Sequence, residues 1–403
     1  MQQLRLAERM GNMSGSAVRE ILKITQQPNM ISFAGGLPSP ESFPVAELQE
    51  ITHEVYAKTG AQMLQYGITE GYQPLNEFIA HWLKATKQIN AEPADIQITS
   101  GSQQGIDLVS RVFLNKGDQV IVESPSYLSA FQVFNSYQAS YLPIPSDDQG
   151  MLVDELEKAL ADGTKKPKLV YTVATFNNPT GITMNLERRK KLLQLADKHN
   201  LIIIEDNPYG ELRYQGEHVP TLKSLDTQGR VVYLGSFSKV VAPGLRIGYA
   251  IAHPEIRSRI TIAKQAADVH SSNLSQQIIY EYCSRGYLDP HIQEICLAYG
   301  VKRDAMFQAL GSYFPKEVKW TRPEGGLFIW AELPPGSDTT ELLRQAVDQR
   351  VAFVPGTPFY ANNTGQNTLR LNFSNATLEQ IDYGIGKIGE VIKEYLAVNS
   401  QLK

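Results

Sequence analysis

Cysteine is scarce in this chain of 403 residues: there are only two, Cys283 and Cys296, and they form no CxxC motif. Without a dense cysteine framework the fold needs no disulfides, and we expect a reducing, cytoplasmic location. The seven histidines are scattered without an HExxH motif, so no metal site is expected. Basic residues number 38 against 42 acidic residues, and this balance argues against a nucleic-acid partner.

Long apolar runs are missing as well. Leu201–Ile204 is typical of those present, and it is strand-sized, far short of the roughly 20 residues of a membrane span. Residues 1–20 carry charged side chains rather than an apolar segment, so we expect neither a signal peptide nor a membrane partner. The composition is that of a globular protein, and the length predicts two domains, since one ordinary domain has roughly 100–200 residues.

The middle of the chain alternates short apolar runs with helical patterns. The predicted strands are rich in β-branched residues and lie at Ile96–Thr99, Gln119–Glu123, Leu169–Ala174, Leu201–Glu205, Val231–Gly235 and Ile247–Ala252. The predicted helices between them are Gln103–Leu114, Val153–Leu160 and Leu186–His199. This alternation predicts an α/β fold with a mostly parallel sheet and helices on both faces. Binding sites in such sheets collect beyond the carboxyl ends of the strands.

The two flanks follow other patterns. The N-terminal part holds a predicted short helix at Ala17–Thr25 and then a loop rich in glycine and proline. After about residue 285, a long helix is followed by mixed strands and helices, which predicts a smaller α+β domain. We therefore expect an N-terminal arm at 1–45, which also contributes to the small domain, a large domain at 46–287 and a small C-terminal domain at 288–403.

The motif GSFSK, Gly235–Lys239, follows a predicted apolar strand. Partial removal from water at a strand end lowers the pKa of a lysine, so Lys239 is a candidate Schiff-base nucleophile. Ser236, Ser238 and Arg246 together have the donors of a phosphate cradle. The alternative is a surface lysine after a strand, with the serines in an ordinary turn.

Three further motifs follow predicted strands. In IEDNPYG, Asp206 and Tyr209 offer a carboxylate for a protonated ring nitrogen and a phenol for a ring hydroxyl. In FNNPTG, the amide of Asn178 is expected to point into the cleft, and ordinary turn chemistry is the alternative in both motifs. In TSGSQQ, the N–H groups of Ser102 and Gln103 at a helix start offer an anion site, with simple N-capping as the alternative.

Taken together, the four strand ends supply what pyridoxal phosphate requires: a lysine, a counter-ion for the ring nitrogen, donors for the ring oxygen and a phosphate cup. The segments NNPTG, EDNPYGEL, SFSKVVAPGLRIGY and TLRLNFS resemble the class I/II aminotransferases of pyridoxal-phosphate fold type I. The similarity to the α-aminoadipate and kynurenine aminotransferase subgroup rests on SAVREILKITQQPNMISFAGGLPSPESFP, LQYGITEGYQPL, ITSGSQQGIDL and VAFVPGTPFYAN. The resemblance covers essentially the whole chain and implies a large domain with a mostly parallel seven-stranded sheet plus a smaller α+β domain.

The resemblance implies a role for each residue of the cofactor site. Lys239 would form the Schiff base and shuttle the proton at the substrate α-carbon, and Asp206 would pair with the ring nitrogen. Asn178 and Tyr209 would hydrogen-bond the ring oxygen, and Tyr127 would stack on the ring. The implied phosphate ligands are Ser102, Gln103, Ser236, Ser238 and Arg246.

The resemblance also implies substrate and subunit contacts. Arg370 would bind the substrate α-carboxylate. The alternative is an outward-facing residue on an edge strand, because Arg370 alternates with Leu369 and Leu371. Tyr66 would reach the phosphate of a neighbouring subunit in a homodimer, or serve as an ordinary interface aromatic. Gly36 lies in the loop that closes over the substrate. Arg19 would meet a distal carboxylate, and a solvated arginine beside Glu20 is the alternative.

The implied activity is transamination by ping-pong chemistry between the pyridoxal and pyridoxamine forms of the cofactor. The amino group would move between an L-amino acid (2-aminoadipate, aromatic, kynurenine-like or branched-chain) and a 2-oxo acid such as 2-oxoglutarate. A lyase or decarboxylase on the same fold is the alternative, since fold does not fix function. A transcription regulator with a winged helix is disfavoured because the chain opens into the enzyme-like arm, and a pure amino-acid-binding module would not need Lys239.

Overall fold

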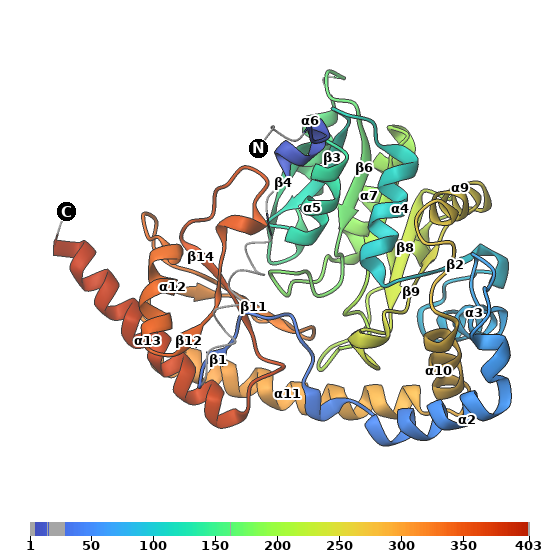
Figure 1. Cartoon of the computed structure of the whole chain (residues 1–403). Coiled ribbons are helices and arrows are strands. Elements are labelled where there is room, and N and C mark those ends of the chain that lie inside the picture. Colours follow the sequence, from blue (N-terminus) through green and yellow to red (C-terminus); the bar gives the residue numbers. More distant parts are fainter. Residues whose placement is uncertain (1–4, 14, 16–28, 162, 402–403) are drawn as a thin grey trace.

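The computed structural model describes residues 5–13, 15, 29–161 and 163–401. A large sheet flanked by helices lies beside a smaller sheet, and the long helix α11 (Leu288–Tyr313) runs below both parts (Figure 1). This is the predicted α/β class. The short helix predicted at Ala17–Thr25 lies outside the described residues.

The large sheet has eight strands in the order β2-β9-β8-β7-β6-β3-β4-β5. Their bounds are β2 Ile96–Thr99, β3 Gln119–Ser124, β4 Ser140–Asp147, β5 Gly150–Met151, β6 Pro167–Thr172, β7 Ile202–Asp206, β8 Val231–Ser236 and β9 Gly248–Ile251. This is one strand more than the seven implied by the resemblance. The extra strand arises because the chain turns back after β4, so that Gly150 pairs antiparallel with Asp147.

Strand direction places the functional motifs at one edge of this sheet. The central pairs from β4 to β8 are parallel, whereas β9 runs antiparallel to both β8 and β2. The sequence pattern predicts a parallel strand here, and the structure corrects this. Because β9 is reversed, its beginning lies beside the carboxyl ends of β2 and β8. Arg246, just before β9, therefore reaches the same edge as Ser236 and Thr99.

Helices cover both faces of the large sheet, as its apolar strands predict. Ile203 packs with one apolar cluster that includes residues of α6 (Val153–Ala161), α7 (Leu186–Lys198) and α8 (Leu222–Leu225). Its neighbour Ile204 belongs to the other cluster, which includes residues of α4 (Ser102–Phe113) and α5 (Leu128–Ser136). Successive residues of one strand are thus buried on opposite faces.

The small sheet is antiparallel and has the order β10-β11-β14-β13. Its strands are β10 Lys319–Trp320, β11 Phe328–Glu332, β14 Thr368–Asn372 and β13 Val354–Pro355, and beside it β1 (Ile31–Ser32) pairs with β12 (Val351–Ala352). The helices of this part are α11, α12 (Thr339–Asp348) and α13 (Leu378–Gln401). The N-terminal segment is therefore tied to the C-terminal part of the chain.

The remaining helices lie at the large-sheet end of α11 (Figure 1). They are α2 Val45–Met63, α3 Gln73–Lys87, α9 Pro254–Gln265 and α10 Asn273–Ser284, and the short 3-10 turns are Glu8–Asn12, Pro40–Ser42, Pro93–Asp95, Pro243–Leu245 and Thr357–Phe359. None of the helices in the described ranges combines the length and the apolar character needed to cross a membrane.

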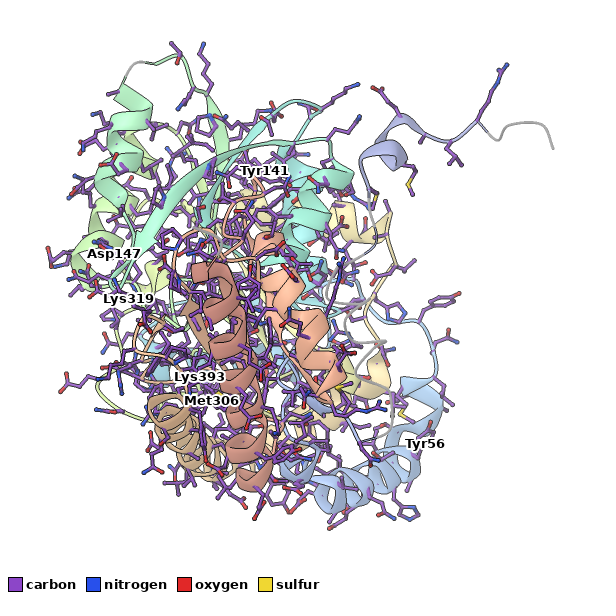
Figure 2. All side chains as sticks on the ribbon, turned by 90° about the vertical axis from the view of Figure 1, so that its left-hand side faces the viewer. Tyr56, Tyr141, Asp147, Met306, Lys319 and Lys393 are labelled. Carbon is purple, nitrogen blue, oxygen red and sulfur yellow. The ribbon has the colours of Figure 1, made fainter. Side chains whose placement is uncertain are left out.

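Strand β4 is not predicted by the sequence pattern, because it contains Pro143 and Pro145. Tyr141 and Asp147 mark the two ends of this strand in the side view (Figure 2). Prolines are unfavourable inside a sheet because they have no N–H to donate. Here the strand is nonetheless paired along β3, from Ser140 opposite Gln119 onward.

Candidate active site

A cavity of about 660 Å³ opens at the carboxyl edge of the large sheet. Its lining residues include Gly36, Ser102, Gln103, Tyr127, Asn178, Asp206, Tyr209, Ser236, Ser238, Lys239, Arg246 and Arg370. The fold thus brings together every sequence-predicted site residue except Tyr66, which does not line this cavity, and Arg19, which lies outside the described residues. The motifs are distant in sequence, and the shared edge of the sheet is what joins them.

Lys239 lies three residues beyond the end of β8, and its Nζ donates a hydrogen bond to the carbonyl oxygen of Gly36 at 2.8 Å. Burial, together with the positive charges of Arg246 and Arg370, lowers the pKa of Lys239 to about 8. A larger fraction of this amine than of an ordinary lysine is therefore neutral near physiological pH. A neutral amine is the nucleophilic form that a Schiff base requires.

Asp206 ends strand β7 and is 2% exposed. The hydroxyl of Tyr171, on the adjacent strand β6, donates to its Oδ2 at 2.9 Å. Burial raises the pKa of Asp206 to about 6, whereas the hydrogen bond from the Tyr171 hydroxyl and the nearby hydroxyl of Ser102 oppose that rise. Among the described residues, no hydrogen-bond partner reaches the buried Oδ1. The carboxylate therefore offers one oxygen to a donor in the cavity.

Tyr171 is a functional residue that the sequence reasoning misses. Its hydroxyl orients the carboxylate of Asp206, and its side chain is fully buried. The signal is a phenol in an otherwise apolar strand, since a buried tyrosine hydroxyl usually has a polar partner. That partner is Asp206 because β6 pairs with β7, and this pairing cannot be predicted from the local sequence pattern.

The start of α4 and the turn before β9 form a cradle. Helix α4 begins at Ser102 without a side-chain cap, so its first N–H groups are available to an anion. Arg246 has left-handed backbone geometry and donates to the Ser100 carbonyl oxygen at 3.0 Å. Gly101 has φ +79°, in the left-handed region that favours glycine, and the Arg246 guanidinium lies against its Cα.

Asn178 connects the two halves of the cavity. Its Nδ2 donates to the Tyr209 hydroxyl at 3.2 Å, and its Oδ1 accepts from Arg370 Nη1 at 2.8 Å. Arg370 lies on β14 of the small sheet, is 3% exposed and stacks on the Phe328 ring at 4.2 Å. Its Nη2 donates to the Ala34 carbonyl oxygen at 2.7 Å. The interpretation of Arg370 as an outward residue of an edge strand is therefore wrong: β14 is an inner strand.

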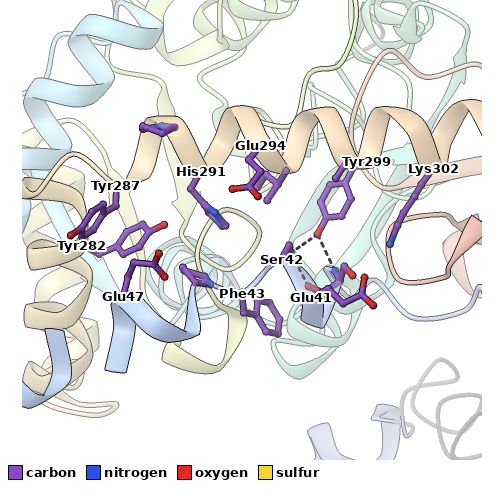
Figure 3. Close-up of a pocket in the computed structure, with 15 residues that line it drawn as sticks. Glu41, Ser42, Phe43, Glu47, Tyr282, Tyr287, His291, Glu294, Tyr299 and Lys302 are labelled. Carbon is purple, nitrogen blue, oxygen red and sulfur yellow. Dashed lines mark hydrogen bonds between the residues drawn. The ribbon is translucent and has the colours of Figure 1, made fainter. Parts of the chain in front are cut away.

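A second cavity, of about 480 Å³, runs along α11 (Figure 3). There the Tyr299 hydroxyl accepts from the Ser39 N–H at 2.9 Å and lies 3.2 Å from the Ser42 hydroxyl. These bonds tie the segment before α2 to α11. Lys302 in this cavity donates to the Ser374 carbonyl oxygen at 3.0 Å. None of the four strand-end motifs lines this cavity, so the chemistry is expected in the first one.

The first cavity fits an aromatic cofactor that carries an anionic group and a reactive carbonyl. Asp206 Oδ1 is open to a donor, the start of α4 and Arg246 offer donors to an anion, and Lys239 supplies an amine with a lowered pKa. Pyridoxal phosphate has these three complementary groups. The site and the fold together define a pyridoxal-phosphate enzyme of fold type I.

Comparison with known proteins identifies the family. The family model for aminotransferase class I and II matches residues 28–388, and the chain belongs to this family. The aromatic-amino-acid aminotransferase 1 of Thermococcus litoralis is 49% identical over 391 residues, covering 96% of this chain and 94% of the relative.

Similar solved structures are aminotransferases as well. The kynurenine aminotransferase of Pyrococcus horikoshii, in complex with PMP, has a TM-score of 0.94 and 47% identity, covering 97% of each chain. The α-aminoadipate aminotransferase of Thermus thermophilus, complexed with N-(5'-phosphopyridoxyl)-L-leucine, has a TM-score of 0.91 and 40% identity, covering 98% of each chain. The protein is thus a pyridoxal-phosphate-dependent aminotransferase, which moves an amino group between an amino acid and a 2-oxo acid. When bound, the cofactor supplies an electron sink for the negative charge formed at the substrate α-carbon.

Proposed function

We propose that Lys239 would hold the cofactor through its amine until the amine of the substrate displaces it, and that the freed amine would then move the proton at the α-carbon of the amino-acid substrate. This role is supported by its position in the cavity and by its lowered pKa of about 8. Asp206 holds the ring nitrogen through its free Oδ1. Tyr127, which lines the same cavity at the start of α5, stacks on the ring. The phosphate is held by Ser102, Gln103, Ser236, Ser238 and Arg246.

Arg370 binds the α-carboxylate of the substrate. The main observation in support of this proposal is the hydrogen bond from Arg370 to Asn178. One amide contacts Arg370 through its oxygen and Tyr209 through its nitrogen. These two contacts support a role of Asn178 between the bound carboxylate and the cofactor ring oxygen. Burial lowers the pKa of Arg370 to about 10, so it remains a cation at neutral pH. Gly36 accepts the hydrogen bond of Lys239 and closes this end of the site.

The proposed common pair is glutamate and 2-oxoglutarate, with an aromatic amino acid, kynurenine, 2-aminoadipate or a branched-chain amino acid as the second substrate. The names of the relatives support this range. Met13, Leu128 and Gln132 line the cavity together, and they offer apolar surface with one amide. Arg19, in the segment that follows Met13, is the proposed partner of a distal carboxylate.

We propose that the enzyme is a homodimer in which Tyr66 reaches the cofactor phosphate of the partner subunit. Tyr66 is 81% exposed, and the large apolar residues Leu64 and Ile68, close to it in the chain, are exposed as well. The Tyr66 ring contacts the His270 ring, and Val269, which precedes His270, is also exposed. An exposed apolar surface of this kind is typical of an interaction site. The proposal predicts that Tyr66→Phe weakens cofactor binding while leaving the sedimentation of the dimer unchanged.

We also propose the division into an arm at 1–45, a large domain at 46–287 and a small domain at 288–403. It is supported by the pairing of β1 with β12 and by the start of α11 at Leu288. A cytoplasmic location is proposed because Cys283 and Cys296 are both free thiols.

Half-reaction screening tests the substrate proposal. The purified holoenzyme is mixed with each amino acid, and the visible absorbance of the bound cofactor is followed as the pyridoxamine form accumulates. We expect conversion with glutamate and with at least one aromatic or 2-aminoadipate-like donor. Release of ammonia or carbon dioxide in place of this conversion would show a lyase or decarboxylase instead.

A further inference from the structure

A buried carboxylate lies behind the wall of the active-site cavity without lining it. Glu123 is the last residue but one of β3 and is 3% exposed. Its Oε2 accepts hydrogen bonds from the Val173 N–H at 3.0 Å and from Asn177 Nδ2 at 2.8 Å. Both donors belong to the segment between β6 and α7 that carries Asn178.

Asn177 is the centre of the turn that follows. Its Oδ1 accepts from the Thr180 N–H at 3.2 Å and from the Thr180 hydroxyl at 3.1 Å. Its backbone carbonyl accepts from the Gly181 N–H at 2.6 Å. The preceding Phe176 has φ +51°, in the left-handed region that a phenylalanine rarely adopts, so the turn needs external contacts to persist. Glu123 makes such a contact from the neighbouring strand.

We propose that Glu123 is a positioning residue for Asn178: by holding the amide of Asn177, it fixes the direction in which the amide of Asn178 points. Asn178 must present its oxygen to Arg370 and its nitrogen to Tyr209 at the same time. A rotation of the turn would break that double contact. The inference rests on the proposed role of Asn178 at the cofactor ring oxygen.

The charge state of Glu123 suits this role. Burial raises the pKa of Glu123 to about 7, whereas the hydrogen bonds from Val173 and Asn177 and the positive charge of Arg189 oppose the rise. Near neutral pH Glu123 is therefore close to its pKa, and Glu123→Gln removes the part of the negative charge that is present. The neutral amide oxygen of glutamine accepts a hydrogen bond more weakly than a carboxylate oxygen, and this weakens the contact to Asn177.

Glu205 provides a matched control. It is also a buried carboxylate near the end of a strand, 1% exposed, and it accepts from the N–H groups of Leu222 at 2.9 Å and Lys223 at 2.8 Å. These bonds hold the start of α8, and Glu205 also lies 3.7 Å from Arg189, which donates to Ala174 and Thr175 in the segment before Asn178. A merely structural effect of losing a buried carboxylate should therefore appear equally in Glu205→Gln.

The experiment is a pH titration of the visible absorbance of the holoenzyme, since a hydrogen bond to the ring oxygen sets the pKa of the Schiff base. The variants are Glu123→Gln, Glu205→Gln and Asn178→Ala. We expect Asn178→Ala and Glu123→Gln to move the titration midpoint in the same direction, Glu123→Gln by about 0.5–1 pH unit, the size of one misaligned hydrogen bond. Glu205→Gln should move the midpoint less than Glu123→Gln does, because both hydrogen bonds of Glu205 go to the start of α8, even if this variant unfolds at a lower temperature.

A midpoint that moves in Asn178→Ala but not in Glu123→Gln would overturn the positioning role alone. An unmoved midpoint in Asn178→Ala would overturn the proposed role of Asn178, and the inference with it. Should Glu123→Gln not fold, Asn177→Ala breaks the same link from the other side, and an unchanged midpoint there would refute the proposal.

Discussion

Removal of the Arg370 side chain is expected to damage the reaction of every amino acid, because all of them share the α-carboxylate. The guanidinium is nearly fully buried between the Phe328 and Phe359 rings, at 4.2 Å and 5.0 Å from their centroids. Its Nε is buried without a hydrogen-bond partner among the described residues. A planar, preorganised donor of this kind binds a carboxylate through two hydrogen bonds.

The magnitude follows from these two bonds. Each charge-assisted hydrogen bond is worth about 1.5–3 kcal/mol, so Arg370→Ala removes about 3–6 kcal/mol of transition-state binding. At about 1.36 kcal/mol per decade, kcat/KM should fall by about 10²–10⁴. Arg370→Lys keeps the charge but loses the fork, and retaining one bond limits the loss to about 10–100-fold.

The assay is the half-reaction with glutamate and with an aromatic amino acid, measured at saturating cofactor. The ratio of the two kcat/KM values should remain close to that of the unaltered enzyme. Arg303→Ala is the control, because Arg303 is also a buried arginine, 5.7 Å from the Tyr214 ring, but does not line the cavity. A loss below tenfold in Arg370→Ala, or a loss confined to one substrate, would refute the carboxylate role.

Three further predictions concern other residues of the site. Lys239→Ala should abolish fixation of the cofactor by borohydride and nearly all turnover, and a reduced adduct mapped to another lysine would contradict this assignment. In the unaltered apoenzyme the rate of cofactor capture should rise with pH through about 8, because the neutral amine is the reactive form. Asp206→Ala should weaken cofactor binding by about 1.5–3 kcal/mol and slow the half-reaction by more, and near-normal turnover at saturating cofactor would be inconsistent with it. Arg19→Ala should lower kcat/KM about 10–100-fold for glutamate and 2-aminoadipate but spare aromatic substrates, whereas equal losses would mean that Arg19 only holds its own segment.

The sequence is most informative where local chemistry and strand ends coincide. Lys239, Asp206, Asn178 and Arg246 each follow or precede an apolar strand, and the structure gathers all four around one cavity. Their convergence could be predicted because parallel strands share a carboxyl edge. Asn178 is predicted to point into the cleft, and it lines the cavity.

What could not be predicted depends on the pairing of distant segments. The bond of Tyr171 to Asp206 and that of Glu123 to Asn177 arise from neighbouring strands whose order is not stated by any local pattern. The reversal of β9 has no signal either, because a strand buried on both faces has the same apolar composition in either direction. Tyr66 stays a prediction, since its proposed partner belongs to a second subunit.

The prolines of β4 also bear on how the enzyme behaves at high concentration. The carbonyl oxygen of Pro145 accepts from the Leu152 N–H at 2.8 Å, so this residue faces the outer side of the sheet, and Pro143, two residues earlier, faces the same way. Neither can offer an N–H to an approaching strand. Because β5 covers only Ser146 and Asp147, the rest of this rim would otherwise be open to edge-to-edge pairing between molecules. The same two prolines that obscure the strand in the sequence therefore leave this part of the edge without N–H donors for another strand.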